Sequence, residues 1–316
     1  MRERNMFQGN EICCGTYAFL NTVQDRKIDC KKFEITSSVP FGIRHREEKD
    51  YSRLLTTYCD PNIGLDRAAG LWGYSQCKEV FRDSRAALEY ILEKSQTDRC
   101  LVGPLDMGRL GYLVLPNLYA NMDHYITVFR EDGILFCMDS EGIPIRRTNR
   151  EELRDWLLVT GLPEAEGCIS VRSYRKAESF SGDEREKRAI RGSFNLIVKN
   201  FVEACESGQG NYAIEKCWQW LKECPVMRWR LSFLYDIAYL SQRKILQQYW
   251  CRLMDEMHLP EGNLLQEAEQ IMGVQIHILG NMFHTLQREN MVYECDFHEM
   301  AELEANLSIV IANSQK

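Results

Sequence analysis

The sequence lacks the features that mark exported and membrane-spanning chains. Its first fifteen residues, MRERNMFQGNEICCG, contain no apolar run, so we expect no signal peptide. No stretch of about 18 apolar residues occurs, so we expect no transmembrane helix and no membrane partner. The net charge of −7 leaves no general basic surplus, which argues against non-specific binding of nucleic acid.

The sequence also lacks the local cysteine and histidine pairs of common metal sites. It has no CxxC, CxxxC or HExxH motif, so we predict no metal. Its 13 cysteines are odd in number and scattered over a long chain, unlike the frameworks of small disulfide-rich secreted proteins. We therefore expect reduced thiols and a cytoplasmic protein.

What is present is an ordinary globular composition in two differently patterned halves. The chain has 316 residues, of which 45% are hydrophobic and 27% charged, enough for one large domain or two medium ones. The first half mixes short apolar runs with turns. The REDG sequence predicts a β-hairpin turn between two of these runs, and Asn149 and Gly161 fit the start and end of a helix. The predicted strands cover residues 100–105, 124–129, 134–140 and 168–174, and the predicted helix covers 150–161.

A charged, polar stretch at 175–188 separates the halves. Beyond it, apolar residues recur at the three-and-four spacing of amphipathic helices. We predict an α+β domain over residues 1–178 and an all-helical domain over 179–316. The segment 37–64 shows little periodicity, so we interpret it as a loop over the cleft or as short elements that the pattern does not reveal. The tryptophans and tyrosines of the second half either line a substrate channel or fill the core.

The most informative stretch runs from Gln8 to Leu20. Cys14 stands just before a predicted helix, where unpaired N–H groups and the helix dipole lower the pKa of a thiol. Gly15 lets the backbone approach a substrate carbonyl, and the Gln8 amide is a candidate oxyanion donor. Cys13 is the alternative nucleophile, although a core position is the simpler interpretation for it.

A thiolate needs a base, and the predicted hairpin supplies one. His124 opens the first strand, and Asp139 closes the second. In an antiparallel pair the start of one strand lies opposite the end of the next, so Asp139 can orient the ring of His124. Asp106 follows a buried strand and is interpreted as a turn residue that binds its own backbone, with contact to substrate as the alternative.

These motifs resemble a known group of enzymes. Gln8 and Cys14-Gly15, then HYITV from His124, then a strand ending in Asp139, look like papain-like peptidases, with the C39 group similar in local pattern. The stretches VGPLDMGRLGY, DHYITV and MDSEGIP resemble the butirosin-biosynthesis-protein-H-like family more closely. The resemblance covers roughly the whole chain, and its specific motifs lie in the first 145 residues. It implies a papain-like fold with a helical C-terminal extension.

The resemblance also implies a reaction. By analogy, Cys14, His124 and Asp139 would move an acyl group from the phosphopantetheine thioester of an acyl or peptidyl carrier protein to a small-molecule amine. The product would be an amide in nonribosomal antibiotic or specialised-metabolite biosynthesis, and no cofactor would be needed beyond the carrier's own arm. Two features depart from the family pattern, namely the Cys13-Cys14 pair and Ser140 after Asp139. A cysteine peptidase or amide hydrolase with the same triad is the alternative, and a binding protein with an inactive papain-like fold is the third possibility.

Overall fold

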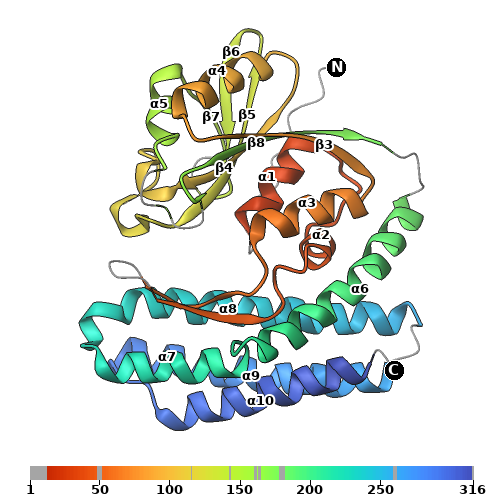
Figure 1. Ribbon diagram of the computed structural model, residues 1–316, viewed down its shortest axis with the longest axis vertical. Coiled ribbons are helices and arrows are strands. Elements are labelled where there is room, and N and C mark those ends of the chain that lie inside the picture. Colours follow the sequence, from red (N-terminus) through yellow and green to blue (C-terminus); the bar gives the residue numbers. More distant parts are fainter. Residues whose placement is uncertain are drawn as a thin grey trace. The chain divides into compact units, whose positions relative to one another are not determined.

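The computed structural model describes residues 13–47, 52–114, 116–141, 144–159, 162, 165–177, 182–258 and 262–314. The chain forms two compact units. The first holds the residues up to Phe33 together with Ala69–Arg185, and the second holds Glu34–Ala68 together with the residues from Glu186 onward. The fold class is α+β, as the sequence predicts, and the helices and sheets can be followed in Figure 1.

The division differs from the predicted boundary at residue 178 in one respect. The last change of unit, after Arg185, falls near that boundary, but Glu34–Ala68 belongs to the later, helical unit. The chain therefore passes between the units three times. These passages lie within α2 (Cys30–Thr36), α3 (Pro61–Leu71) and α6 (Gly182–Glu206).

The first unit contains a six-stranded antiparallel sheet with the order β3-β8-β4-β5-β6-β7. All four strands predicted from the sequence are in it. The remaining elements of the unit are the helices α1 (Cys14–Val23), α4 (Ser84–Lys94) and α5 (Arg150–Trp156) and the short 3-10 turns Met107–Arg109 and Pro116–Tyr119. The strands are β3 (Tyr74–Phe81), β4 (Cys100–Asp106), β5 (Asp123–Glu131), β6 (Ile134–Met138), β7 (Ile145–Arg147) and β8 (Ile169–Lys176).

Helices cover both faces of this sheet, and the alternation of side chains along β5 shows how. Ile126 and Val128 point into a buried cluster that includes residues of α4 and α5. Thr127, between them, points the other way and donates a hydrogen bond to the carbonyl oxygen of Ala18 in α1, at 2.8 Å. A strand whose successive side chains face opposite layers must be apolar nearly throughout, which explains the sequence HYITVF.

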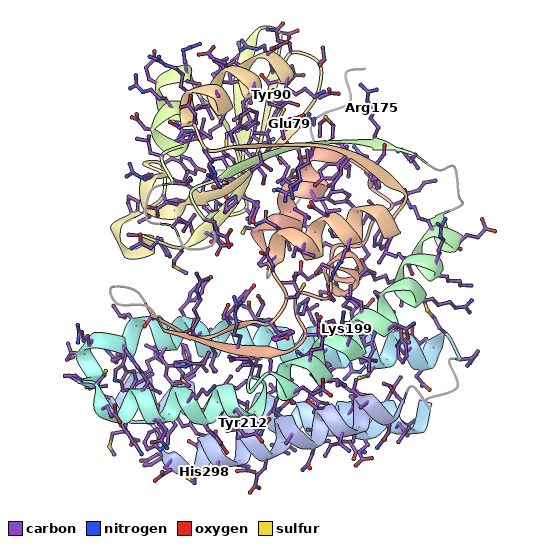
Figure 2. All side chains as sticks on the ribbon, viewed as in Figure 1. Glu79, Tyr90, Arg175, Lys199, Tyr212 and His298 are labelled. Atoms are coloured by element: carbon purple, nitrogen blue, oxygen red, sulfur yellow. The ribbon has the colours of Figure 1, made fainter. Side chains whose placement is uncertain are left out.

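Strand β3 forms one edge of the sheet and is polar for that reason. Its residues from Ser75 to Val80 are exposed, and they include Lys78 and Glu79. Figure 2 labels Glu79 on this strand and Arg175 on the neighbouring β8. Charged side chains on an edge strand discourage pairing with another chain.

The predicted hairpin is confirmed. Strands β5 and β6 pair antiparallel, with Glu131 opposite Ile134, so the loop consists of Asp132 and Gly133 alone. Both loop residues have positive φ, 50° and 78°. Two successive positive φ angles define the type I′ turn that a two-residue hairpin favours, and Asp-Gly is one of its preferred sequences.

The second unit is a helical assembly with a small hairpin. The predicted helical stripes lie in α6, α7 (Asn211–Glu223), α8 (Val226–Glu256) and α9 (Gly262–Glu289), and α10 (Glu294–Asn313) completes the set. Of the two interpretations of 37–64, the structure confirms short elements, since the segment contains β1 (Ile43–Glu47) and β2 (Ser52–Thr57). Their residues Ile43 and Leu55 join a cluster with α7–α10. Trp229 and Trp250 are buried in the clusters of this unit, which supports the core interpretation for them.

Candidate functional site

Helix α1 begins at the two adjacent cysteines. Cys13 is the N-cap residue, with extended backbone angles, and Cys14 is the first helical residue. The residues from Gly15 to Thr22 are buried, and Gln24 ends the helix in the left-handed conformation with its N–H on the carbonyl oxygen of Leu20. The burial of α1 therefore anchors the turn that carries the two cysteines.

The two adjacent thiols act on each other, and their pKa values shift in opposite directions. The hydrogen bond from Cys14 and the backbone N–H groups of Thr16 and Gly15 lower the pKa of Cys13 to about 7, against the opposing effect of burial. The hydrogen bond with Cys13, burial and the charge of Cys13 raise the pKa of Cys14 well above its ordinary value. The predicted lowering thus falls on Cys13, not on Cys14.

The reason lies in the capping geometry. The N-cap side chain is the one that folds back over the free N–H groups of the second and third helical residues. Here those residues are Gly15 and Thr16, and although the Cys13 sulfur makes no full capping hydrogen bond, their N–H groups act on it. Cys14, one residue later, instead interacts with the backbone of Tyr125 in β5. The negative charge of Asp123 makes a smaller, upward contribution to the pKa of each thiol.

His124 and Asp139 form a buried pair, as the sequence predicts. His124 Nε2 lies 2.7 Å from Asp139 Oδ1, and their side chains are 1% and 0% exposed. Burial lowers the pKa of His124, but the charge and hydrogen bond of Asp139, with the charges of Glu141 and Asp123, outweigh it and raise the pKa. The pair therefore favours the imidazolium form of the ring more than free histidine does, and Nε2 carries the proton that faces the carboxylate.

The Asp139 carboxylate is held by two further donors. The N–H of Glu141 donates to Oδ1 at 2.8 Å, and the hydroxyl of Tyr112 donates to Oδ2 at 2.5 Å. Burial raises the pKa of Asp139, but the charge and hydrogen bond of His124 and the hydrogen bonds from Glu141 and Tyr112 outweigh it, so the net shift is downward. Sequence reasoning missed Tyr112, because a tyrosine in a turn carries no local signal for such a contact.

Strand β5 is the element that links the thiols to the histidine in the described contacts. Cys14 interacts with the backbone of Tyr125, the residue after His124, and Asp123, the residue before it, acts on both thiols. Among the described residues, the His124 ring makes no hydrogen bond with either sulfur. Contacts between catalytic groups are often long before substrate binds. Gln8, the candidate oxyanion donor, lies outside the described residues.

Asp106 is a turn residue, as predicted. Its Oδ1 accepts the N–H groups of Gly108 and Asn121, each at 2.9 Å. These bonds fix the loop that leads from β4 to the start of β5. Asp106 thus shapes the approach to His124 through the backbone.

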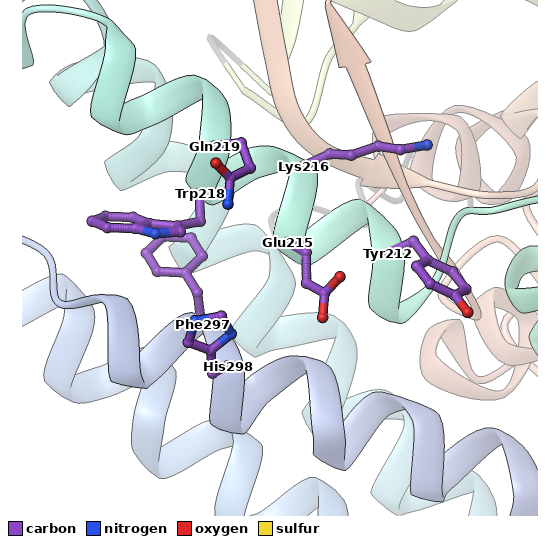
Figure 3. Close-up of a pocket in the computed structure, with 7 residues that line it drawn as sticks. All are labelled: Tyr212, Glu215, Lys216, Trp218, Gln219, Phe297 and His298. Atoms are coloured by element: carbon purple, nitrogen blue, oxygen red, sulfur yellow. The ribbon is translucent and has the colours of Figure 1, made fainter.

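A separate hollow lies on the helical unit, between α7 and α10. It has a volume of about 310 Å³, and the rings of Trp218 and Phe297 at its wall are 5.2 Å apart (Figure 3). Tyr212 and His298, labelled in Figure 2, also line it. Trp218 is one of the aromatic residues for which the sequence left both a channel and a core position open. It borders this space, and its indole N–H donates to Glu294 at 2.9 Å.

The described part of the chain contains no group of three or more His, Cys, Asp or Glu side chains suited to holding a metal ion. Among the same residues, no helix combines the length and the apolar composition needed to cross a bilayer. No model of a known protein family matches the chain, and no curated protein matches its sequence.

Proposed function

We propose that this protein is a cysteine acyltransferase that carries an acyl group from a carrier-protein thioester to an amine. The observation that supports it is the buried His124–Asp139 pair at the start of β5, next to the strand backbone that the Cys14 side chain faces. A raised histidine pKa favours an imidazolium as the partner of a thiolate, and of the two thiols Cys13 is the one whose pKa is lowered. With this chemistry we also propose the papain-like fold for the first unit, because α1 carries the thiols and packs on the sheet that carries the histidine.

Cys14 is the proposed nucleophile, because it faces the strand that begins at His124. In the first step Cys14 passes its proton to the Cys13 thiolate, and the resulting Cys14 thiolate attacks the thioester carbonyl carbon. The C–S bond to the phosphopantetheine arm then breaks, and the leaving thiolate takes the proton of the His124 imidazolium. In the second step the amine nitrogen attacks the acyl-enzyme, its proton passes to His124, and the Cys14 thiolate leaves. Asp139 keeps the ring oriented throughout.

Cys13 is the alternative nucleophile, and its lowered pKa of about 7 makes the test essential. The experiment is intact-protein mass spectrometry after mixing with a panel of small acyl thioesters. Wild type is compared with Cys14→Ala and Cys13→Ala, which remove one sulfur each at adjacent positions. We expect an acyl adduct on wild type and Cys13→Ala and none on Cys14→Ala. An adduct on Cys14→Ala that is absent from Cys13→Ala would assign the nucleophile to Cys13.

The fate of the adduct separates the transferase from the hydrolase. We expect added amines to discharge it much faster than water does, with the amide as product. Discharge by water alone, or cleavage of peptides without a thioester adduct, would favour the peptidase or amide hydrolase. Absence of any adduct on any thioester, with no cleavage, would refute cysteine catalysis altogether.

A further inference from the structure

The hydroxyl of Tyr112 occupies the one side of the Asp139 carboxylate that the histidine does not use. Oδ1 receives both His124 Nε2, at 2.7 Å, and the N–H of Glu141, at 2.8 Å. Oδ2 receives the Tyr112 hydroxyl at 2.5 Å. The carboxylate is therefore fixed at both oxygens, and its rotation about the Cβ–Cγ bond would break the contact with His124.

The Tyr112 side chain is itself held in place. The Arg146 guanidinium lies 4.7 Å from the centroid of its ring, and Trp156 packs edge-on against it with ring centroids 5.1 Å apart. Glu152, in the first turn of α5, binds Arg146 at 2.6 Å. Cation–π and edge-to-face contacts of this kind restrict a ring to one orientation. A continuous set of contacts thus runs from α5 to the histidine.

Tyr112 is a donor whenever the protein is folded. Burial raises the pKa of its phenol far above the ordinary range, and the charges of Cys137 and Asp139 raise it further. The hydroxyl therefore keeps its proton across the working range of a cysteine enzyme. Oδ2 of Asp139 is the acceptor of that proton in the described geometry.

The geometry points to Tyr112 as a positioning residue that acts through Asp139 to set the orientation and the charge state of His124. This role deepens the proposed function, because the effect of Tyr112 on acyl transfer rests on that function. Its effect on the titration of His124 does not depend on what the enzyme's substrate is. Tyr112 touches neither the thiols nor the reacting atoms in the described contacts, so it is not assigned a catalytic role.

The direction in which the His124 pKa changes depends on which charge state of His124 the Tyr112–Asp139 hydrogen bond stabilises more. The Tyr112 bond stabilises a bare Asp139 carboxylate more than one whose charge is already balanced by an imidazolium. Loss of the bond therefore raises the pKa at which Asp139 ionises and also raises the pKa at which His124 loses its proton. The groups that face the pair and enter this titration are Asp123, Glu141, Tyr112 and Cys137, with Arg146 behind Tyr112.

The test is Tyr112→Phe, with the His124 ring followed by NMR titration in the full-length protein. A hydrogen bond to a charged group corresponds to about one to two pKa units. Only part of it differs between the charged and the neutral state of His124, so we expect the His124 pKa to rise by up to about one unit. Because a higher His124 pKa favours the thiolate, we also expect alkylation of Cys13 or Cys14 by iodoacetamide to extend to lower pH. An unchanged His124 titration in a folded Tyr112→Phe protein would overturn the assignment.

Tyr74→Phe is the matched control. The Tyr74 hydroxyl also donates to a carboxylate in the same unit, Asp25, at 2.7 Å, and Tyr74 is buried whereas Tyr112 is partly buried. Its loss removes the same kind of bond, so we expect a similar decrease in stability and no shift in the His124 titration. If both variants moved the His124 pKa equally, the effect of Tyr112 would be a general consequence of loosening the unit, and the assignment would be wrong.

A second variant keeps the proposal testable if Tyr112→Phe folds poorly. Replacement of Tyr112 by 3-fluorotyrosine retains the hydroxyl and makes it a stronger donor, so the His124 pKa is expected to fall. A rise or no change would contradict the inference. Failure of the proposed function would appear differently, as a wild-type protein that forms no acyl adduct although its His124 pKa still responds to position 112.

Discussion

The helical unit contains a fully buried ion pair that permits a sharp test of its packing. Lys244 Nζ in α8 lies 2.5 Å from Glu304 Oε2 in α10, and the two side chains are 0% and 1% exposed. Gln275 in α9 donates to the same oxygen at 2.9 Å. Burial lowers the pKa of Lys244 in spite of the charge of Glu304, so desolvation outweighs attraction at the ammonium.

The perturbation is Lys244→Met, which removes the cation at nearly constant length. It leaves the Glu304 carboxylate buried with only the Gln275 amide among its described partners, and an uncompensated buried charge costs about 3–5 kcal/mol of unfolding free energy. The double variant Lys244→Met with Glu304→Gln removes both charges and keeps an acceptor for Gln275. We expect it to recover most of that loss and to lie within about 1–2 kcal/mol of wild type.

The assay is urea unfolding of the full chain at pH 7.5, followed by circular dichroism. If the single variant were as stable as the double variant at pH 7.5, the reasoning would be refuted, since water would then have to reach Glu304.

Two further predictions concern the first unit. The Asp139→Asn substitution removes the main charge that opposes the effect of burial on His124, so the His124 pKa should fall below its usual value. Acyl-adduct formation should slow by about 10²–10⁴-fold. An unchanged His124 titration measured by NMR would contradict this. In Gly103→Ala, the added Cβ would lie 2.4 Å from Tyr125 Cδ1 and 2.7 Å from the His124 carbonyl oxygen, so β4 and β5 must move apart. We expect a loss of about 1–3 kcal/mol in urea unfolding, whereas Gly111→Ala, with nothing within 4 Å of its added Cβ, should be nearly neutral; equal effects of the two would argue against the close approach.

The parts of the fold that the sequence predicted are those with strong local signals. The Asp-Gly turn specified the β5–β6 hairpin, and Asn149 capped α5 by accepting the N–H of Glu152. The hairpin in turn brought His124 and Asp139 together, because pairing order alone places a strand's first residue near the end of the next strand. These predictions needed no knowledge of tertiary packing.

The parts that were missed depend on contacts between distant segments. Residues 34–68 show little periodicity because they are short elements whose burial comes from helices more than a hundred residues later, as with Ile43 and Leu55. Tyr112 meets Asp139 across 27 positions of sequence, in a turn whose path depends on Asp106. The choice between Cys13 and Cys14 required the exact start of α1, and a shift of one residue exchanges which thiol faces the free N–H groups.

The length of the turn at Asp132 and Gly133 sets the register in which β5 and β6 pair, and through it the geometry of the candidate site. The turn lies roughly 25 Å along β5 from His124, at about 3.3 Å per residue. It nevertheless fixes the register of β6, and so it fixes that Asp139, the residue after β6, lies beside the histidine. An inserted residue there, unless absorbed as a bulge, would slide β6 by one position and turn Asp139 toward the opposite face of the sheet. Substitutions in this turn should therefore leave the His124–Asp139 pair in place, whereas insertions or deletions should disrupt it, although no residue of the turn belongs to the site.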